Sequence, residues 1–197
     1  TPVPPITVND TEYTMEELVQ DVLIGIDCAI VSNVESVSGS DFGQASSIGY
    51  FDQNGSTFPF TNGIVMATGG ITEAPGPWPG DATFDNTGWP GDADLSDIIA
   101  EGGNTGPLNN ASVLEFDFVP FIDEISFNFL FASSEYGTFQ CTFSDAFAFI
   151  LTGPTTAVDG DNLAVIPGTT IPVSVVNIRD EAYNGNCDSQ NPDYFAQ

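Results

Sequence analysis

Val113-Leu-Glu-Phe-Asp-Phe-Val119 opens the stretch that decides the fold, and Glu124-Ile-Ser-Phe-Asn-Phe-Leu-Phe131 and Asp145-Ala-Phe-Ala-Phe-Ile-Leu151 complete it. In each segment large apolar side chains, many of them phenylalanine, recur at every second position with mostly polar or small residues between them, which is the period of a strand that buries one face. Three such strands separated by turns predict an antiparallel sheet, in which each buried phenylalanine contributes about 1.5–3 kcal/mol. The side chains expected on the buried faces are Leu114, Phe116, Phe118, Ile125, Phe127, Phe129, Phe131, Phe147, Phe149 and Leu151.

The rest of the chain adds shorter elements around these three segments. A capping box of Thr14 and Glu17 starts a helix that ends at Gly25. Asp92 or Asp94 caps a second short helix. Further strands are expected at 28–34, 48–51, 63–68, 163–166 and 172–178. The predicted fold class is mainly β, an antiparallel β-sandwich of jelly-roll type with one or two short helices.

The charge balance excludes several kinds of partner. The 197 residues include 28 acidic residues, one basic residue (Arg179) and no histidine, which gives a formal net charge of -27. A surface of this charge repels nucleic-acid phosphates and anionic lipid headgroups, and it suits cations or neutral glycans. No apolar run approaches the roughly 18 residues that a membrane span needs. We therefore expect no nucleic-acid partner and no direct membrane insertion.

The three cysteines favour one disulfide and one free thiol. They show no C-x-x-C spacing, and no histidine is present to complete a zinc site. We favour a disulfide between Cys141 and Cys187, because both lie in polar, loop-like sequence. Cys28, between Ile26 and Ile30, is then a buried free thiol. Three reduced thiols are the alternative.

Carboxylates in two places are candidate ligands of Ca²⁺. Asp92 and Asp94 form one pair, with Asp97 three residues further on. Glu135 follows the second phenylalanine-rich strand and Asp145 opens the third, so strand pairing would bring the two to one end of a sheet. Two adjacent carboxylates raise a pKa unless a cation lies between them. The alternatives are that Asp92 and Asp94 cap a helix, and that Glu135 and Asp145 stabilise turns.

A loop at 69–90 contains both tryptophans and is rich in glycine and proline. Trp78 and Trp89, with Phe84 and Tyr50, would make an aromatic platform for sugars if their faces are exposed. The alternative is that these rings cover the end of a sheet.

Catalysis finds little support in the sequence. Without histidine there is no Ser-His-Asp set, and phosphate-binding glycine loops are missing. Acidic residues are so numerous that no pair is marked as the acid and nucleophile of a glycosidase. Arg179 stands beside Asp180 and Glu181, which predicts a salt bridge more than a ligand site. We expect no enzyme activity.

Two motifs carry a family resemblance. Phe131-Ala-Ser-Ser-Glu-Tyr136 and Phe143-Ser-Asp-Ala-Phe-Ala-Phe-Ile-Leu151 resemble the choice-of-anchor L domain of secreted bacterial proteins, common in Bacteroidetes. The blocks that agree elsewhere are Leu18-Val-Gln-Asp-Val-Leu23, Phe58-Pro-Phe, Gly63-Ile-Val-Met-Ala-Thr-Gly69, Pro90-Gly-Asp-Ala-Asp-Leu95, Val113-Leu-Glu-Phe-Asp-Phe-Val119 and Ile166-Pro-Gly-Thr. The resemblance covers residues 14–197, with residues 1–13 as an extended arm.

The resemblance implies an extracellular module of large surface proteins. Such proteins are often exported by the type IX secretion system, and some resemble gliding adhesins. Family members continue with further strands, so we expect this chain to be the N-terminal part of a longer polypeptide. Its sheet is then incomplete or is completed by strand addition from the rest of the parent chain. A C-terminal region absent here would hold the parent protein at the outer membrane.

The expected function is therefore adhesion or gliding motility by a non-catalytic module. Its expected partners are the secretion machinery during export and surface glycans or another polysaccharide, and Ca²⁺ is expected to hold acidic loops together. One alternative is a carbohydrate-active enzyme, or its glycan-binding accessory domain, that uses paired carboxylates. Another is a passive spacer.

Overall fold

The computed structural model describes residues 3–25, 27–76, 88–101, 103, 106–154, 156 and 160–195. The chain forms two compact units. The first unit comprises residues 1–91 and 108–127, and the second comprises residues 92–107 and 128–197. In both units the paired strands are antiparallel and the helices are short, which confirms the predicted mainly β class. Face-to-face packing as a sandwich involves both units and stays a prediction.

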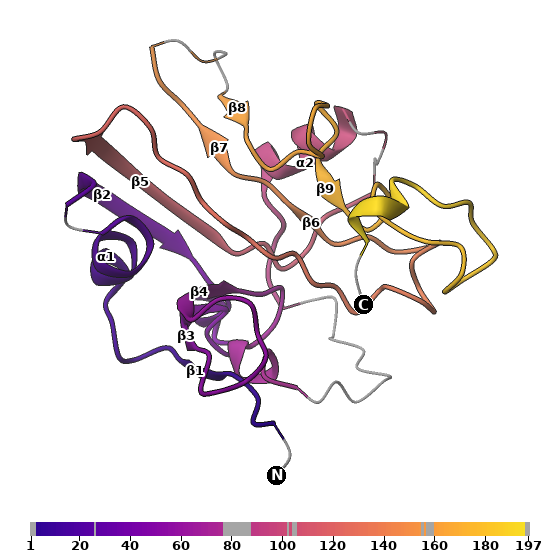
Figure 1. The fold of residues 1–197 in the computed structure, drawn as a ribbon, viewed down its shortest axis with the longest axis horizontal. Coiled ribbons are helices and arrows are strands. Elements are labelled where there is room, and N and C mark those ends of the chain that lie inside the picture. Colours follow the sequence, from indigo (N-terminus) through magenta and orange to yellow (C-terminus); the bar gives the residue numbers. More distant parts are fainter. Residues whose placement is uncertain are drawn as a thin grey trace. The chain divides into compact units, whose positions relative to one another are not determined.

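The first unit contains a three-stranded sheet in the order β1-β3-β4 (Figure 1). The strands are β1 (Thr7–Asn9), β3 (Ile48–Asp52) and β4 (Asn62–Met66). Gly49 allows the close approach of its neighbours, because a Cβ there would lie 2.6 Å from the carbonyl oxygen of Asn9 and 2.5 Å from Cδ1 of Ile71. The predicted N-terminal arm thus contributes an edge strand to this sheet.

The second sheet of this unit pairs β2 (Ala29–Val37) with β5 (Val113–Pro120). An irregularity between Ser32 and Glu35 shifts the register. The predicted alternation in β5 holds: Leu114, Phe116 and Phe118 pack against a buried cluster of Val19, Ile24 and Ala29. Cys28 also packs there as a free thiol.

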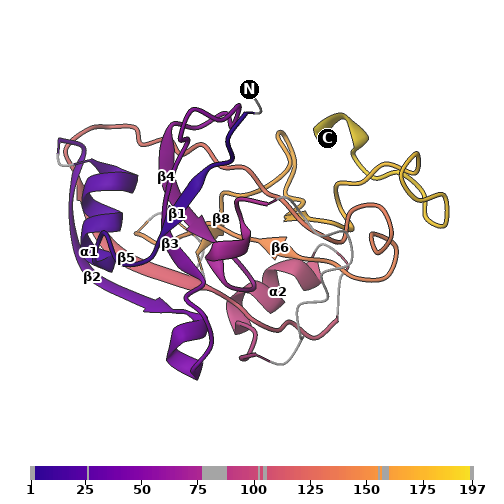
Figure 2. The ribbon, with the colours of Figure 1, turned by 90° about the horizontal axis from the view of Figure 1, so that it is seen from below.

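A helical segment supplies that cluster from the N-terminal side. α1 (Met15–Glu17) continues into the π-helical η1 (Leu18–Ile24), and Figure 2 shows this segment alongside β2 and β5. The predicted capping box is present, since the Glu17 N–H donates to Thr14 Oγ1 at 3.2 Å and the Thr14 N–H donates to Glu17 Oε2 at 2.8 Å. The Gln20 amide also pairs with the edge of β2, donating to the Ala29 carbonyl and accepting from the Val31 N–H.

Short 3₁₀ turns complete the first unit. They are η2 (Gly39–Phe42) and η3 (Ile71–Glu73). Next to η2, the buried Ser38 and Ser47 bond to each other through their hydroxyls at 3.2 Å. The Ser112 hydroxyl joins this network, since its oxygen lies 2.6 Å from Ser47 Oγ and 2.6 Å from the Ala67 carbonyl oxygen.

The second unit has much less regular structure. It contains α2 (Ala93–Glu101), four two-residue strands and the 3₁₀ turn η4 (Pro192–Tyr194). The strands pair as β6 (Ala146–Phe147) with β9 (Val173–Ser174) and as β7 (Ile150–Leu151) with β8 (Asp161–Asn162). Its buried apolar side chains are Ile99, Ala164, Ile166, Val173 and Val175.

Several predicted strands are corrected by the structure. Residues 124–131 form no strand, and Phe129, expected inside, is 46% exposed. Residues 145–151 form only β6 and β7. The segments 163–166 and 172–178 are reduced to β9 and an isolated bridge between Val165 and Pro172. Alternation identifies the face that a residue would present, but a strand also needs a hydrogen-bonded neighbour.

Candidate functional site

The second unit brings Glu135 and Asp145 together, as the sequence predicted. Ser133 lies between them, and its hydroxyl is 2.6 Å from Glu135 Oε2 and 2.7 Å from Asp145 Oδ2. The Asp145 N–H also donates to Glu135 Oε2 at 3.1 Å. Asp145 is placed by the start of β6, where the Val175 N–H bonds to its carbonyl oxygen. The turn after residue 131 places the other two side chains.

This carboxyl pair holds a proton. Burial, the hydrogen bond with Glu135 and the negative charge of Glu135 together raise the pKa of Asp145 to about 7, against a lowering by the Ser133 hydroxyl. A hydrogen bond between two carboxyl groups requires a proton on one of them. One serine hydrogen cannot satisfy both carboxylates at once, so a proton on Asp145 supplies the second link. Near pH 7 the Asp145 carboxyl is therefore about half protonated.

Tyr136 is a third titratable side chain that feels the charges of the carboxyl pair. Burial raises the pKa of Tyr136 to about 12, with contributions from the negative charges of Asp145 and Glu135. Its phenol therefore stays protonated over the whole physiological range.

The geometry disfavours hydrolysis of a glycoside at this pair. A retaining glycosidase keeps its two carboxyl groups about 5–5.5 Å apart and an inverting one keeps them further apart, because the sugar and a water pass between them. Here Glu135 and Asp145 hydrogen-bond to each other and share one serine hydroxyl. That contact leaves no room for a substrate between the two groups.

The four predicted metal ligands do not form one site. Among the residues that the structure describes, no group of three or more His, Cys, Asp or Glu side chains is arranged to hold a metal. Asp92 acts as a helix cap, since its Oδ1 accepts the Leu95 N–H at 2.8 Å, which is the alternative considered for it. Asp94 lies exposed in the first turn of α2. Of the four predicted ligands, Glu135 and Asp145 lie close enough together to be proposed as a cation site.

The predicted aromatic platform is not supported at Trp89. This side chain is 7% exposed, and its indole N–H donates to the Ala111 carbonyl at 2.8 Å. A Cβ on Gly39 would lie 2.9 Å from its ring, so Trp89 packs closely against η2. Its role is structural, because a buried face cannot stack on a sugar. Trp78 and Phe84 lie outside the described residues.

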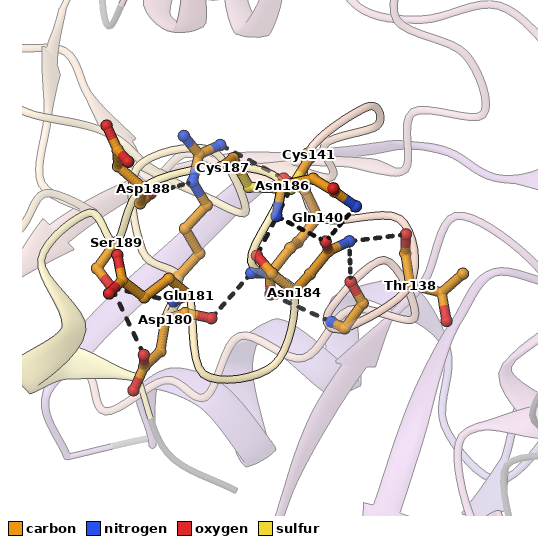
Figure 3. The surroundings of a disulfide bond; sticks show 12 residues. Thr138, Gln140, Cys141, Asp180, Glu181, Asn184, Asn186, Cys187, Asp188 and Ser189 are labelled. Carbon is orange, nitrogen blue, oxygen red and sulfur yellow. Dashed lines mark hydrogen bonds between the residues drawn. A yellow bond between two sulfur atoms is a disulfide. The ribbon is translucent and has the colours of Figure 1, made fainter.

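The disulfide joins Cys141 to Cys187, the pair that the sequence favoured (Figure 3). Side-chain amides reinforce the same region. Gln140 is fully buried, and its amide donates to the Asp180 carbonyl and accepts from the Gly137 N–H. The Asn184 amide donates to the carbonyls of Gly137 and Thr138. These loops are therefore held by one covalent bond and several side chain to backbone bonds, with little help from strands.

Arg179 lies in this stapled region but does not make the predicted salt bridge. Its Nε donates to the Asp188 carbonyl at 3.0 Å and its Nη1 to the Gln140 carbonyl at 3.4 Å. Within the described ranges these bonds to backbone oxygen replace an ion pair with Asp180 or Glu181. The guanidinium thus connects the segment that contains Gln140 to the segment that contains Asp188. The acidic neighbours of Arg179 in the sequence did not indicate this role.

Comparison with known proteins places the chain in a family. The model of the Choice-of-anchor L domain matches residues 7–197. No curated protein and no solved structure matches the chain. Every helix in the described part of the chain is too short or too polar to span a bilayer. Because the family match covers nearly all of its length, the chain belongs to the Choice-of-anchor L domain family, whose members are cell-surface-associated modules.

Proposed function

We propose that this chain is a non-catalytic extracellular module of a large bacterial adhesin and that its second unit presents the adhesive surface. The observation that carries the proposal is the pair of stapled loops, residues 137–143 and 179–195. There the disulfide, Gln140, Arg179 and Asn184 fix loops that have almost no secondary structure. Rigid loops on a scaffold are where binding surfaces occur, and pre-organisation lowers the entropy lost on binding. A passive spacer has no need of such a surface.

The route to the surface and the anchor follow from the resemblance to gliding-adhesin proteins of Bacteroidetes. We place the module outside the cell after export by the type IX secretion machinery, with the parent protein held at the outer membrane by a C-terminal region. A disulfide agrees with an oxidising exterior. A single basic residue agrees with survival among trypsin-like proteases.

Adhesion is tested by coating beads with the purified chain and measuring their retention on glass, polystyrene and polysaccharide films under flow. The control is the same chain after reduction and alkylation of its cysteines, which removes the staple but keeps the composition and the charge. We expect the oxidised chain to retain several-fold more beads. Equal retention of the two preparations would favour the passive spacer. Hydrolysis of a film, lost on a single Asp or Glu change, would favour the carbohydrate-active enzyme.

We propose in addition that Ca²⁺ replaces the proton held by Glu135 and Asp145. The pair offers two carboxylates and the Ser133 hydroxyl, fewer than the six to eight oxygens that Ca²⁺ takes, so water completes the shell and the affinity falls in the weak extracellular class. The cation competes with the proton, so its effect grows as pH rises through the pKa of Asp145.

Calcium should therefore raise the melting temperature at about pH 8 and much less at about pH 5, because a ligand of the native state stabilises it by about 2.7 kcal/mol at 100 Kd. Asp145→Asn should lose this response, while Asp94→Asn, on exposed α2, should keep it. The measurement is thermal unfolding in calcium and in EDTA, with bound metal assayed by mass spectrometry. An identical response in wild type and Asp145→Asn would place the cation elsewhere.

A further inference from the structure

The stapled loops carry an aromatic cluster that the sequence analysis did not single out. The Phe195 ring lies between Tyr136, at a centroid distance of 4.8 Å, and Tyr183, at 5.0 Å. Tyr194 precedes Phe195 at the end of η4. Tyr183 is 42% exposed, and Tyr194, the neighbour of Phe195 in sequence, is 49% exposed.

Both exposed tyrosines stand on backbone that is pinned on either side. The Tyr183 N–H donates to the Asp180 carbonyl at 3.2 Å, and the next residue is Asn184, whose amide bonds hold it to the 137–138 turn. The Tyr194 N–H donates to the Asn191 carbonyl at 3.1 Å, and the Asn191 amide donates to the Asn177 carbonyl at 2.8 Å. The backbone that carries the two rings is therefore held in place, and a ligand would order little of it on binding.

The simplest alternative is a small satellite core in which Phe195 is shielded by tyrosines. That interpretation accounts for Tyr136, which is half-buried and lies near enough to Asp145 and Glu135 for their negative charges to raise its pKa. It does not account for Tyr183 and Tyr194, which keep nearly half of their surface in water although the chain has apolar contacts to offer. Tyrosine with one face open combines flat apolar area with a hydroxyl, the combination that recurs at recognition surfaces.

The charge around these rings selects the class of ligand. Asp180, Glu181 and Asp193 lie next to the two tyrosines in sequence, and the whole chain carries -27. Carboxylates accept hydrogen bonds from sugar hydroxyls, whereas they repel sulfated or uronic-acid polymers. Apolar sugar faces stack on aromatic rings without needing a charge.

From these observations we infer that Tyr183, which packs against Phe195, and Tyr194, the exposed neighbour of Phe195 in sequence, form a contact surface for a neutral polysaccharide. This inference rests on the adhesive function proposed above and names its ligand class. It also moves the sugar contact from the tryptophan loop, where Trp89 is buried, to the disulfide-stapled loops.

Native affinity electrophoresis tests the inference, with the whole chain run through gels that contain hydroxyethyl cellulose, mixed-linkage β-glucan, mannan or alginate. We expect at least one of the three neutral polymers to retard wild type and alginate to leave it unretarded. Tyr183→Ala and Tyr194→Ala, on separate segments, should each weaken binding about 3- to 10-fold, the worth of one aromatic contact. Tyr183→Phe keeps the ring and should bind nearly as well as wild type.

Phe42→Ala is the matched control, because Phe42 is 45% exposed but lies in the first unit. Melting temperatures check that each variant is folded, and the two alanine variants stand in for each other if one is not. Retardation by none of the neutral polymers, or equal retardation of both alanine variants and wild type, would overturn the inference. If the beads still adhere to glass or polystyrene in that case, the adhesive function stands and only its polysaccharide ligand falls.

Discussion

Replacing Cys141 and Cys187 together by serine should lower the free energy of unfolding of the second unit by about 4 kcal/mol. The bond closes a loop across a sequence separation of 46 residues, and the chain-entropy model gives about this value for a loop of that length. The second unit has little else to compensate, because its strands are two residues long and its buried apolar set is small. We expect the stapled loops to open while the β2–β5 sheet of the first unit keeps its own hydrogen bonds and core.

The opening of the stapled loops can be measured by the rate at which trypsin cleaves after Arg179. Arg179 is the only basic residue of the chain, and in the folded state its guanidinium bonds to the carbonyls of Gln140 and Asp188. Cleavage after Arg179 should be slow in wild type and at least tenfold faster in the double variant, since proteolysis follows the population of the open form. The fragments 1–179 and 180–197 stay joined in wild type until the disulfide is reduced, so gels with and without reductant also show that Cys187 is bonded to the larger fragment.

Cys28→Ser is the control for this experiment. Cys28 is a free, half-buried thiol that packs in the first unit, so its replacement should leave the rate of cleavage after Arg179 unchanged. A double variant that resists trypsin as well as wild type does would show that Gln140 and Asn184 hold the loops without the covalent bond.

The elements that the sequence predicted well are those in which local rules and tertiary packing agree. The capping box at Thr14 and the alternation in β5 each correspond to a feature of the structure, because helix capping and a one-sided core determine them locally. The segment 124–131 has the same alternation as β5 but forms no strand in the structure. Its periodicity contained no information about a pairing partner.

The candidate site shows the same division. Glu135 and Asp145 were expected to meet if the strands beside them paired. The structure brings the two together around Ser133 although residues 124–131 form no strand. The aromatic cluster on Phe195 was not anticipated, since its members come from three loops that only the disulfide and the amide bonds bring close. The prediction that Trp89 lies on the surface was wrong for a related reason. Its indole N–H donates to the carbonyl of Ala111, which lies 22 residues further along the chain.

The carboxyl pair should make the stability of the second unit depend on pH in a direction opposite to that of an ordinary buried salt bridge. The native state keeps a proton on Asp145 up to about pH 7, whereas an aspartate in the unfolded chain loses it near 3.8. Between these values the native state binds more protons, so the free energy of unfolding falls as pH rises. The contribution is fully present below about pH 4 and lost above about pH 7. Because Asp145 is partly solvated, we expect a loss of about 2–4 kcal/mol.

Asp145→Asn separates this local effect from the repulsion of the whole acidic chain. Asparagine keeps a neutral side chain that can still donate to Glu135, so the variant should be less pH-dependent than wild type between about pH 4 and 7 and at least as stable as wild type near pH 8. Asp94→Asn removes one exposed carboxylate from α2 and should keep the wild-type slope. Urea unfolding across this range, in EDTA to exclude calcium, gives the free energies. If the free energy of unfolding depends on pH in the same way in wild type and in Asp145→Asn, the two carboxyl groups do not share a proton. The geometry around Ser133 requires a steeper dependence in wild type.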